Sequence, residues 1–437
     1  MNKTALIITY YWPPSSGGGV QRWLKFTKYM PEYGWKPVVY TPANPDFHLK
    51  DETLLDDIHP EVKVLKKRII EPYFLLNMIP GIDKKEINTG NQWPSADKLS
   101  LISRVIAWVR GHLFIPDPRI LWKRPSVRFL SGYLKNNKID VIITTGPPHS
   151  MHLIGLALKK KFPDIPWVAD FRDPWSQLDY YQPFLNNPSL KKKHVQLEKC
   201  VLDGADVVLA TSPHMHECLT SFDLRKFACI TNGFDNEDFE KDISTQLNDT
   251  PKDIIRIVHA GLLKQDRKPV QFLEAVRQWV NEDPGIKGKL EILFFGNVDP
   301  HLEEEISMVP ELKDLVRFPG YIPHPEIVQW YKKSALLLLL VNNTQNSKVN
   351  IPGKTFEYLA SGKPVLCLSQ SDADVVTLLK GMGHVRCLEY NDPVATYKTS
   401  IFELLKTDKK IAEEEIKKFS RKSLSEELTK LLHQLIQ

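Results

Sequence analysis

Apolar positions along the chain follow two spacings that alternate. Residues 3–9 form a short apolar run typical of a buried strand, and from Val20 onward apolar residues recur at helical spacing. Residues 37–41 then predict a second strand. A strand, a glycine-rich loop, a helix and a second strand in succession are the opening of a doubly wound sheet.

The same alternation returns later in the chain and continues through its second half. Segments that predict strands, with helical patterns between them, occupy residues 138–150, 166–175, 205–213, 254–261, 290–297, 316–321, 335–341, 364–369 and 384–390. Strands that alternate with helices in this way form mostly parallel sheets. We therefore predict an α/β protein with two Rossmann-like doubly wound domains that face each other across a cleft.

A polar passage between the two series sets the expected domain limits. Residues 231–253 are interpreted as a linker, which leaves an N-terminal domain over 1–230 and a C-terminal domain over 254–415. Residues 45–136 show no clear alternation and are interpreted as an elaboration of the first domain. Residues 416–437 predict an amphipathic helix that packs back on the N-terminal domain. Two domains of about 200 residues each are of ordinary size.

Composition restricts the classes of function. The formal net charge of +5, from 58 basic and 53 acidic residues, is too mild for the concentrated basic stripe of a nucleic-acid-binding protein. The five cysteines are scattered and form no C-x-x-C pair. This pattern argues against a disulfide framework or a zinc site and favours a reducing cytoplasm.

Two basic runs bear on membrane contact. Residues 158–162 and 190–194 are basic enough to contact an anionic inner-membrane surface, although a solvated helix face is the simpler explanation of each run. The longest apolar run, 335–341, is far shorter than the roughly 18 residues of a spanning helix. The apolar stretch 5–12 ends at two prolines and is interpreted as a buried strand rather than a signal peptide. We expect a cytoplasmic protein, with peripheral contact at the inner face of the membrane as an alternative.

Three consecutive glycines, Gly17, Gly18 and Gly19, follow the first predicted strand and open the first helix. Ligands of open α/β sheets bind beyond the carboxyl ends of strands, where missing side chains allow close approach and helix N-termini favour anions. The loop therefore suits a phosphate, and a tight strand-to-helix turn explains it equally well. Its spacing is not G-x-G-x-x-G, so a nicotinamide site is weakly supported.

The second half offers two further candidate sites. Gly261 ends a predicted strand, and Arg267 and Lys268 follow just before a helix, where adjacent cations suit a diphosphate. The alternative is two exposed surface cations. Later, Gly353 leads into a short helix that carries Glu357 in its first turns. A carboxylate accepts two hydrogen bonds side by side and so suits the vicinal hydroxyls of a ribose, whereas an ordinary helix-start glutamate is the alternative.

Two strand ends of the first half carry polar residues as well. His149 lies at a strand tip, where a structural role for a lone histidine is the alternative to a site role. Asp170, Arg172 and Asp173 follow another strand. Two carboxylates that flank an arginine suit acceptor hydroxyls or a buried ion-pair network. We favour the acceptor role because strand-tip loops carry sites.

Five segments occur in an order that resembles glycosyltransferase family 4: GGGVQR, TGPPHS, AGLLKQDRKP, FFGN and PGKTFEYLASGKPVL. The similarity runs over most of the chain except 45–136, and the last segment is the most specific. The resemblance implies the two-domain GT-B fold, with a nucleotide-diphosphate sugar held mainly by the second domain and the acceptor by the first. It also implies retaining sugar transfer of the hexosyltransferase type, without a bound metal and without a cofactor.

The resemblance implies roles for individual residues too. The glycine loop approaches the donor diphosphate, Arg267 or Lys268 neutralises it, Glu357 holds the ribose, and His149 contacts the reacting sugar or the acceptor. The implied donor-binding set is Gly17, Gly18, Gly19, Gly261, Asn350, Gly353, Lys354 and Glu357. By the same analogy, the acceptor is a growing surface polysaccharide or a lipid-linked glycan that is met at the inner face of the membrane.

The sequence departs from the family pattern at two positions. The family commonly carries two glutamates eight positions apart, and the earlier position here is Val349. The arginine that often follows the loop glycine is Leu262. Front-face transfer needs no enzyme nucleophile, because stabilisation of the departing diphosphate is its main requirement. A nucleotide-sugar epimerase on the same fold and a non-catalytic nucleotide-binding relative are the alternative functions.

Residues 372–374, DAD, imitate the metal-binding D-x-D motif of another glycosyltransferase fold. They follow a predicted strand and open a helix, so capping of that helix by Asp372 is the better interpretation. No metal site is predicted.

Overall fold

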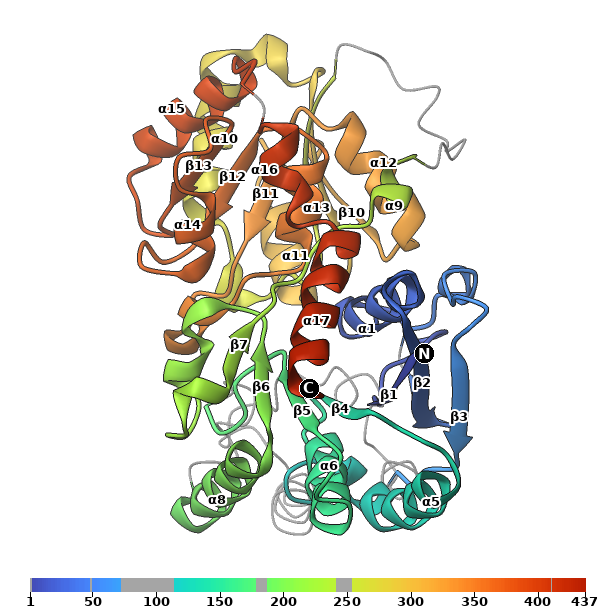
Figure 1. The fold of residues 1–437 in the computed structure, drawn as a ribbon. Coiled ribbons are helices and arrows are strands. Elements are labelled where there is room, and N and C mark those ends of the chain that lie inside the picture. Colours follow the sequence, from blue (N-terminus) through green and yellow to red (C-terminus); the bar gives the residue numbers. More distant parts are fainter. Residues whose placement is uncertain (1, 48, 72–113, 178–186, 241–253, 410) are drawn as a thin grey trace. The chain divides into compact units, whose positions relative to one another are not determined.

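The computed structural model describes residues 2–437 except 48, 72–113, 178–186, 241–253 and 410 (Figure 1). Its contacts divide the chain into two compact units, Met1–Thr231 with Leu424–Gln437 and Asn232–Ser423. Each unit is built on one parallel sheet with helices on both faces, so the predicted α/β class with two Rossmann-like units is confirmed.

The sheet of the first unit has seven strands in the order β3-β2-β1-β4-β5-β6-β7, and every neighbouring pair is parallel. The strands are β1 (Lys3–Ile8), β2 (Trp35–Pro42), β3 (Lys63–Lys67), β4 (Val141–Gly146), β5 (Trp167–Phe171), β6 (Val207–Ala210) and β7 (Phe227–Cys229). The main helices are α1 (Gly18–Tyr29), α5 (Lys123–Asn136), α6 (Ser150–Lys161), α8 (Pro188–Gly204) and α17 (Arg421–Leu435).

Strand periodicity divides the apolar side chains of this sheet between two cores. In β1, Leu6 and Ile8 pack with α5, α6 and α8, whereas Ala5 and Ile7 face α1. The second core also contains three leucines of α17, at Leu424, Leu428 and Leu432. Four-residue spacing aligns these leucines along one side of α17. Because that side shares the core with α1, helix α17 lies on the α1 face of this sheet (Figure 1).

The sheet of the second unit has six parallel strands in the order β10-β9-β8-β11-β12-β13. The strands are β8 (Ile255–Ala260), β9 (Leu290–Phe295), β10 (Val316–Gly320), β11 (Leu336–Leu340), β12 (Val365–Leu368) and β13 (Val385–Leu388). The helices are α9 (Asn236–Glu240), α10 (Val270–Glu282), α11 (Pro300–Ser307), α12 (His324–Lys333), α13 (Lys354–Ala360), α14 (Asp374–Leu379), α15 (Val394–Leu405) and α16 (Glu413–Lys417).

The leucine run of β11 is the centre of this unit. Leu336, Leu338 and Leu340 pack with α10, α11 and α15 on one face of the sheet. The alternate leucines, Leu337 and Leu339, pack with α12, α13 and α14 on the other. A continuous apolar run is expected of a parallel strand that is covered on both faces.

The structure differs from the sequence prediction mainly within residues 45–136. This stretch contributes the edge strand β3 and the helix α5 to the first unit, and its residues 72–113 lie outside the described part of the chain. Strand β7 was not predicted, because three half-buried residues give no detectable period. Of the stretch 231–253, residues 241–253 are not described, and α9 belongs to the second unit.

Candidate functional site

The three glycines after β1 have different geometries. Gly17 has a φ of 91°, in the left-handed region that favours glycine, and it precedes the first residue of α1. Gly18 has open space around it. A Cβ placed on Gly19 would lie only 2.7 Å from Nη1 of Arg172 and 3.2 Å from the ring of Tyr11. Gly19 thus leaves room for the Arg172 guanidinium at the start of α1.

Arg172 brings a cation to the carboxyl edge of the first sheet. Its guanidinium lies 5.7 Å from the centre of the Tyr11 ring and donates a hydrogen bond to the carbonyl of Pro147, while its Nε has no partner among the described residues. Asp173 is half-buried, and the loss of hydration raises its pKa above the ordinary aspartate value, against the opposing effect of Arg172. The structure therefore places Arg172 beside the glycine loop, and both Arg172 and Asp173 are partly exposed.

Asp170 has a different position from the one predicted, because its carboxylate is enclosed. Arg22 donates to it from Nε and Nη2, at 3.1 Å and 2.9 Å, and Trp23 donates from its indole nitrogen at 2.7 Å. The Thr145 hydroxyl adds a bond of 2.8 Å, and Asp170 is fully buried. These bonds hold the Asp170 pKa below its usual value despite burial, and they tie α1 to β4 and β5. Asp170 positions the glycine helix and does not present its oxygens to an acceptor.

His149 lies at the start of α6 and is fully buried. Its ring stacks on Trp175 at a centroid distance of 4.9 Å, and neither ring nitrogen has a partner among the described residues. Burial, with the nearby cationic Arg172, lowers the His149 pKa far below the ordinary histidine value, so the imidazole is neutral. Gly146 makes room for this ring and for His152, since a Cβ there would lie 3.0 Å from His149 Nδ1 and 2.6 Å from His152 Nε2.

A cavity of about 230 Å³ lies at the carboxyl ends of β1 and β2 in the first unit. Its walls are aromatic and proline residues with two lysines at the side, contributed by Trp12, Pro13, Pro14, Thr41, Pro42, Ala43, Asn44, Pro45, Phe47, Lys50 and Lys66. Sequence reasoning did not find this cavity. The segments YYWPP and TPANPDF, which supply most of its walls, each follow a predicted strand and could have indicated a site at this sheet edge.

In the second unit two glycines let the tips of β8 and β9 meet. Gly261 has a φ of 135° and Gly296 a φ of 108°. A Cβ placed on Gly296 would lie 2.4 Å from the Gly261 carbonyl oxygen, so no larger residue fits there without a shift of the backbone. Above them, Lys354 places its Nζ 3.0 Å from a Cβ position on Gly261 and donates to the Ala260 carbonyl at 2.9 Å.

The cations of this unit separate into two groups. Burial, and to a lesser extent the positive charge of Arg267, lower the Lys354 pKa far below the ordinary lysine value. Arg267 donates to the Leu262 carbonyl at 3.1 Å, and its Nε has no hydrogen-bond acceptor among the described residues. Lys268, by contrast, forms an ion pair with Glu305 of α11. Of the predicted pair, Lys268 is therefore engaged by Glu305, whereas Arg267 interacts electrostatically with Lys354.

Glu357 faces a histidine that sequence reasoning missed. Nε2 of His324, the first residue of α12, lies 2.9 Å from a Glu357 oxygen, and the Tyr331 hydroxyl also hydrogen-bonds Glu357. His324 Nδ1 lies 3.8 Å from Asp238. The Glu357 side chain remains partly exposed, at 18%. Sequence reasoning missed this contact because His324 and Glu357 are 33 positions apart in the sequence.

The remaining predicted residues surround α13. Gly353 caps this helix with an ordinary helical φ of −56°, and Asn350 is half-buried, with its backbone nitrogen bonded to the Ser347 carbonyl. Val349, at the position of the family's earlier glutamate, is buried. The interpretation of Asp372 as a helix cap is wrong: Ala373 is the capping position of α14, and Asp372 pairs with Lys348.

Within the described parts of the chain, no group of three or more His, Cys, Asp or Glu side chains is arranged to hold a metal ion. No described helix is both long and apolar enough to cross a membrane.

Comparisons with known proteins agree with this geometry. The model of Glycosyltransferase Family 4 matches residues 91–238, and the model of Glycosyl transferases group 1 matches residues 255–406. A comparison with curated proteins found no match.

Solved structures resemble the whole chain at low sequence identity. A sucrose-phosphate synthase from Thermosynechococcus elongatus is 15% identical with a TM-score of 0.62, and 99% of each chain is covered. A UDP-forming α,α-trehalose-phosphate synthase from Burkholderia vietnamiensis is 11% identical with a TM-score of 0.63, covering 100% of this chain and 98% of its own. A protein described as a UDP-N-acetylglucosamine 2-epimerase from Listeria monocytogenes is 12% identical with a TM-score of 0.55, covering 98% and 95%.

These structural likenesses show the fold, and the two family models add the class of enzyme. Both sheets carry their polar candidate residues at the carboxyl ends of strands, where this fold binds ligands. The chain is a glycosyltransferase of the GT-B fold, with a family 4 match in its first unit and a group 1 match in its second.

Proposed function

We propose that the protein transfers a sugar from a nucleotide-diphosphate sugar to a glycan or lipid-linked acceptor, with retention of anomeric configuration, in cell-surface polysaccharide biosynthesis. The observation that carries the proposal is the cluster at the tips of β8 and β9. There, two positive-φ glycines lie under Lys354, and Arg267 is its neighbour.

The charges of that cluster suit a diphosphate. Burial is the main cause of the lowered Lys354 pKa, and repulsion from Arg267 adds to it. Glu357 near Lys354 and Asp266 near Arg267 oppose part of this effect. A diphosphate placed at Gly261 would neutralise both cations and accept charge-assisted hydrogen bonds from them. The missing side chain at Gly261 leaves space beside Lys354 Nζ, whereas the missing side chain at Gly296 lets the two strand tips meet.

Glu357 would hold the ribose of the same donor. His324 occupies one side of its carboxylate, and this contact fixes the orientation of the remaining lone pairs. Vicinal hydroxyls can donate to those lone pairs. His324 and Tyr331 lie on α12 and Glu357 lies on α13. All three belong to the second unit, so the ribose contact does not depend on the first unit.

Transfer would then proceed without an enzyme nucleophile. The bond between the anomeric carbon and the diphosphate oxygen breaks while the acceptor oxygen bonds to the same face of that carbon. The acceptor proton passes to the departing diphosphate. Arg267 and Lys354 stabilise the negative charge of the leaving group, which replaces the role that a metal ion has in other transferases.

The first unit would receive the acceptor. Its cavity beside Trp12 and Phe47 offers apolar rings, on which the faces of sugars stack, and Lys50 and Lys66 offer cations to an anionic group of the acceptor. Arg172, Asp173 and the glycine loop lie at the same sheet edge. We assign His149 a supporting role, since it is buried under Trp175.

The test is product analysis with a panel of nucleotide-diphosphate sugars and a lipid-linked or oligosaccharide acceptor, in the presence of EDTA. We expect release of nucleoside diphosphate that depends on the acceptor, and a product whose anomeric proton shows the configuration of the donor. An inverted product or loss of activity with EDTA would contradict the mechanism.

The resemblance to the epimerase structure keeps one alternative in the same experiment. An epimerase converts the donor sugar without an acceptor. Conversion of the donor alone would therefore replace the transfer proposal, and nucleotide binding without any turnover would indicate a non-catalytic relative.

A further inference from the structure

Two cysteines lie opposite each other on the last two strands of the second sheet. Cys367 of β12 and Cys387 of β13 are register partners in a parallel pair. Directly paired residues of adjacent strands project their side chains to the same face. The two thiols are hydrogen-bonded to each other, and both are free cysteines.

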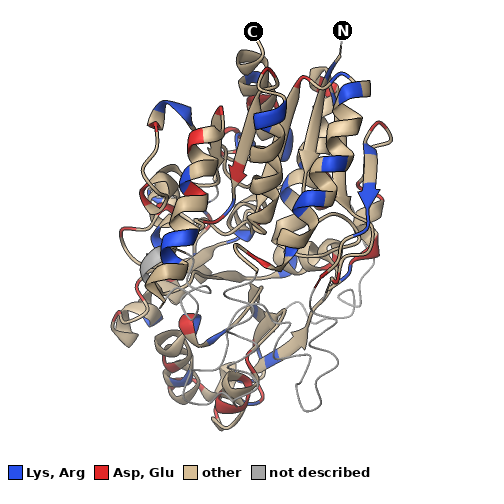
Figure 2. Cartoon of the chain, turned by 90° about the horizontal axis from the view of Figure 1, so that it is seen from below, with Lys and Arg blue, Asp and Glu red and all other residues tan. Residues whose placement is uncertain are grey.

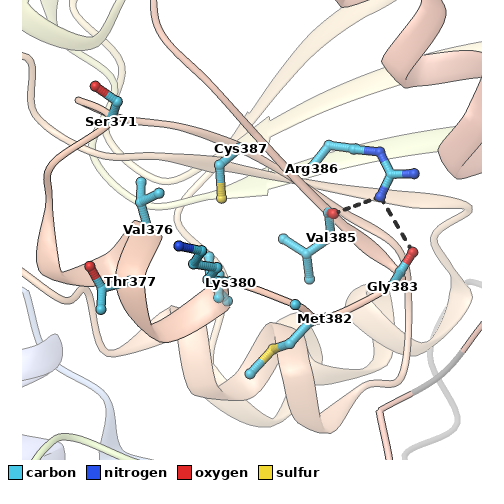
Figure 3. Close-up of a pocket in the computed structure, with 11 residues that line it drawn as sticks. Ser371, Val376, Thr377, Lys380, Met382, Gly383, Val385, Arg386 and Cys387 are labelled. Atoms are coloured by element: carbon cyan, nitrogen blue, oxygen red, sulfur yellow. Dashed lines mark hydrogen bonds between the residues drawn. The ribbon is translucent and has the colours of Figure 1, made fainter.

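Only one of the two thiols is reached from outside. Cys367 is fully buried. Cys387 is half-buried and lines a pocket of about 490 Å³ between β13, α14 and the loop that joins them. In Figure 3 the Cys387 sulfur points into this pocket, toward Val376 and Lys380. A reagent that enters the pocket therefore meets Cys387 first, with Cys367 behind it.

The surroundings make the two thiols unequal. The hydrogen bond from the Cys367 thiol lowers the Cys387 pKa, whereas the same bond, together with burial, raises the Cys367 pKa. Partial burial opposes the lowering at Cys387 without reversing it, and Lys380 lines the same pocket. Cys387 is thus the nucleophile of the pair, and Cys367 is the resolving thiol.

We propose that Cys387 and Cys367 form a redox-active thiol pair, in which the pocket admits one end of a low-molecular-weight disulfide of the glutathione type to Cys387, and Cys367 resolves the product. The Cys387 thiolate attacks one sulfur of the small disulfide, and the other sulfur leaves as a thiol. Cys367 then gives up its proton and attacks the Cys387 sulfur, which releases the second small thiol. One disulfide is reduced to two thiols, and two protein thiols become one disulfide.

The strand geometry permits this link. Adjacent strands lie about 4.8 Å apart, which is within the range of about 4.4–6.8 Å between the Cα atoms of bonded cysteines. The Cβ atoms must approach more closely than ordinary strand pairing places them. A strained cross-strand disulfide is more easily reduced than a structural one, so the link would be reversible.

The other cysteines provide the comparison. Cys200 is exposed on α8 of the first unit and lies far along the chain from the pair. If exposure alone decided reactivity, Cys200 would react before Cys387. If the pair acts as proposed, an internal link forms at Cys387, and Cys200 at most retains a mixed disulfide.

The experiment treats the reduced full-length chain with oxidised glutathione, blocks the remaining thiols with an alkylating reagent at low pH, and maps the cysteine peptides by mass spectrometry. We expect a Cys367–Cys387 cross-linked peptide that disappears after addition of dithiothreitol. The Cys200→Ser variant should form the same link, and the Cys387→Ser variant should not.

The Cys367→Ala variant tests the order of the two steps. It should retain glutathione on Cys387, because the resolving thiol is gone. Since Cys367 is buried, circular dichroism must first show that this variant is folded; the wild-type map decides the proposal without it. Alkylation of both Cys367 and Cys387 in the oxidised wild type would overturn the proposal, as would a lasting glutathione adduct on wild-type Cys387.

Discussion

At the scale of single residues, Lys354 and Arg267 are the main departure from an ordinary protein surface. Burial disfavours the charge of Lys354 at the edge of the second sheet, and the positive charge of Arg267 adds to this effect. Such an arrangement costs stability in the free protein and is relieved by an anion. It is the kind of perturbed group that marks functional sites.

The change Lys354→Met tests this trade-off. Because the folded-state pKa of Lys354 lies below the unfolded value, its protonation destabilises the fold fully at pH values below the folded-state pKa, and this loss is relieved as the pH rises toward the unfolded-state pKa. We expect a melting temperature no lower than that of the wild type at neutral pH. Affinity for a nucleoside diphosphate should fall about tenfold to 150-fold, the equivalent of a charge-assisted bond of about 1.5–3 kcal/mol. The control is Lys313→Met, at an exposed position. A lower melting temperature with unchanged affinity would contradict the assignment.

Gly19→Ala tests the contact between the glycine loop and Arg172. The new Cβ would lie 2.7 Å from Nη1, so the guanidinium must move while the helical backbone at residue 19 stays allowed. We expect a folded protein with a raised KM for the acceptor and unchanged nucleotide affinity. Gly132→Ala, in open space on α5, should leave both quantities at wild-type values. A wild-type acceptor KM in Gly19→Ala would exclude a role for Arg172 in acceptor binding.

At the scale of elements, most strands and helices were predictable, with β3, α5 and β7 as exceptions, and the contacts between elements were not. The apolar run of β11 and the helical pattern of α10 are visible in a short window of sequence, because their periods are local. The bonds from Arg22 to Asp170 and from His324 to Glu357 join residues 148 and 33 positions apart. A single sequence contains no signal for such pairs, so the acceptor role of Asp170 was predicted and the roles of Arg22 and His324 were not.

Helix α6 carries a pH-dependent contact. Burial lowers the His152 pKa to about 3, and the Thr144 hydroxyl lies 2.9 Å from its Nδ1. The unfolded-state pKa is about 6.5. The stabilisation from the neutral imidazole is therefore complete above pH 6.5 and is lost as the pH falls toward the folded-state value, by about 1.4 kcal/mol per pH unit.

Calorimetric melting between pH 7 and pH 5 measures this slope. We expect the free energy of unfolding to fall more steeply on acidification in the wild type than in His152→Gln. The difference in slope should correspond to the uptake of about one proton on unfolding. His301→Gln, at an exposed position, should follow the wild type. Identical slopes for wild type and His152→Gln would show that His152 does not titrate as described.

At the scale of the whole molecule, the distribution of basic residues leads to one further prediction. The last turn of α6 carries Lys159, Lys160 and Lys161, and Lys159 is paired with Asp206. Residues 191–193 are three exposed lysines on α8. Figure 2 shows basic positions spread over several helices with acidic positions among them, so membrane contact would rest on these local runs.

Sedimentation with anionic vesicles tests the alternative, drawn from the sequence, that the protein contacts the membrane peripherally. We expect binding that weakens with salt, since exposed charges are screened within about 8–10 Å. Replacing Lys191, Lys192 and Lys193 by glutamate should weaken it at least tenfold, at about 1 kcal/mol per lysine near the surface. Lys287→Glu with Lys289→Glu and Lys313→Glu, at three exposed positions of the second unit, is the charge-matched control. Equal sedimentation with neutral vesicles, or no effect of the α8 changes, would contradict contact through this run.

The most direct test of the account is calorimetric titration of the protein with UDP, GDP, ADP and dTDP, each in the presence of EDTA. We predict one-to-one binding of at least one of them, which Glu357→Gln weakens about tenfold or more and which Glu304→Gln, at an exposed position of α11, leaves unchanged. Absence of binding for all four nucleotides, or equal affinity in wild type and Glu357→Gln, would contradict a nucleotide-sugar donor held by the second unit.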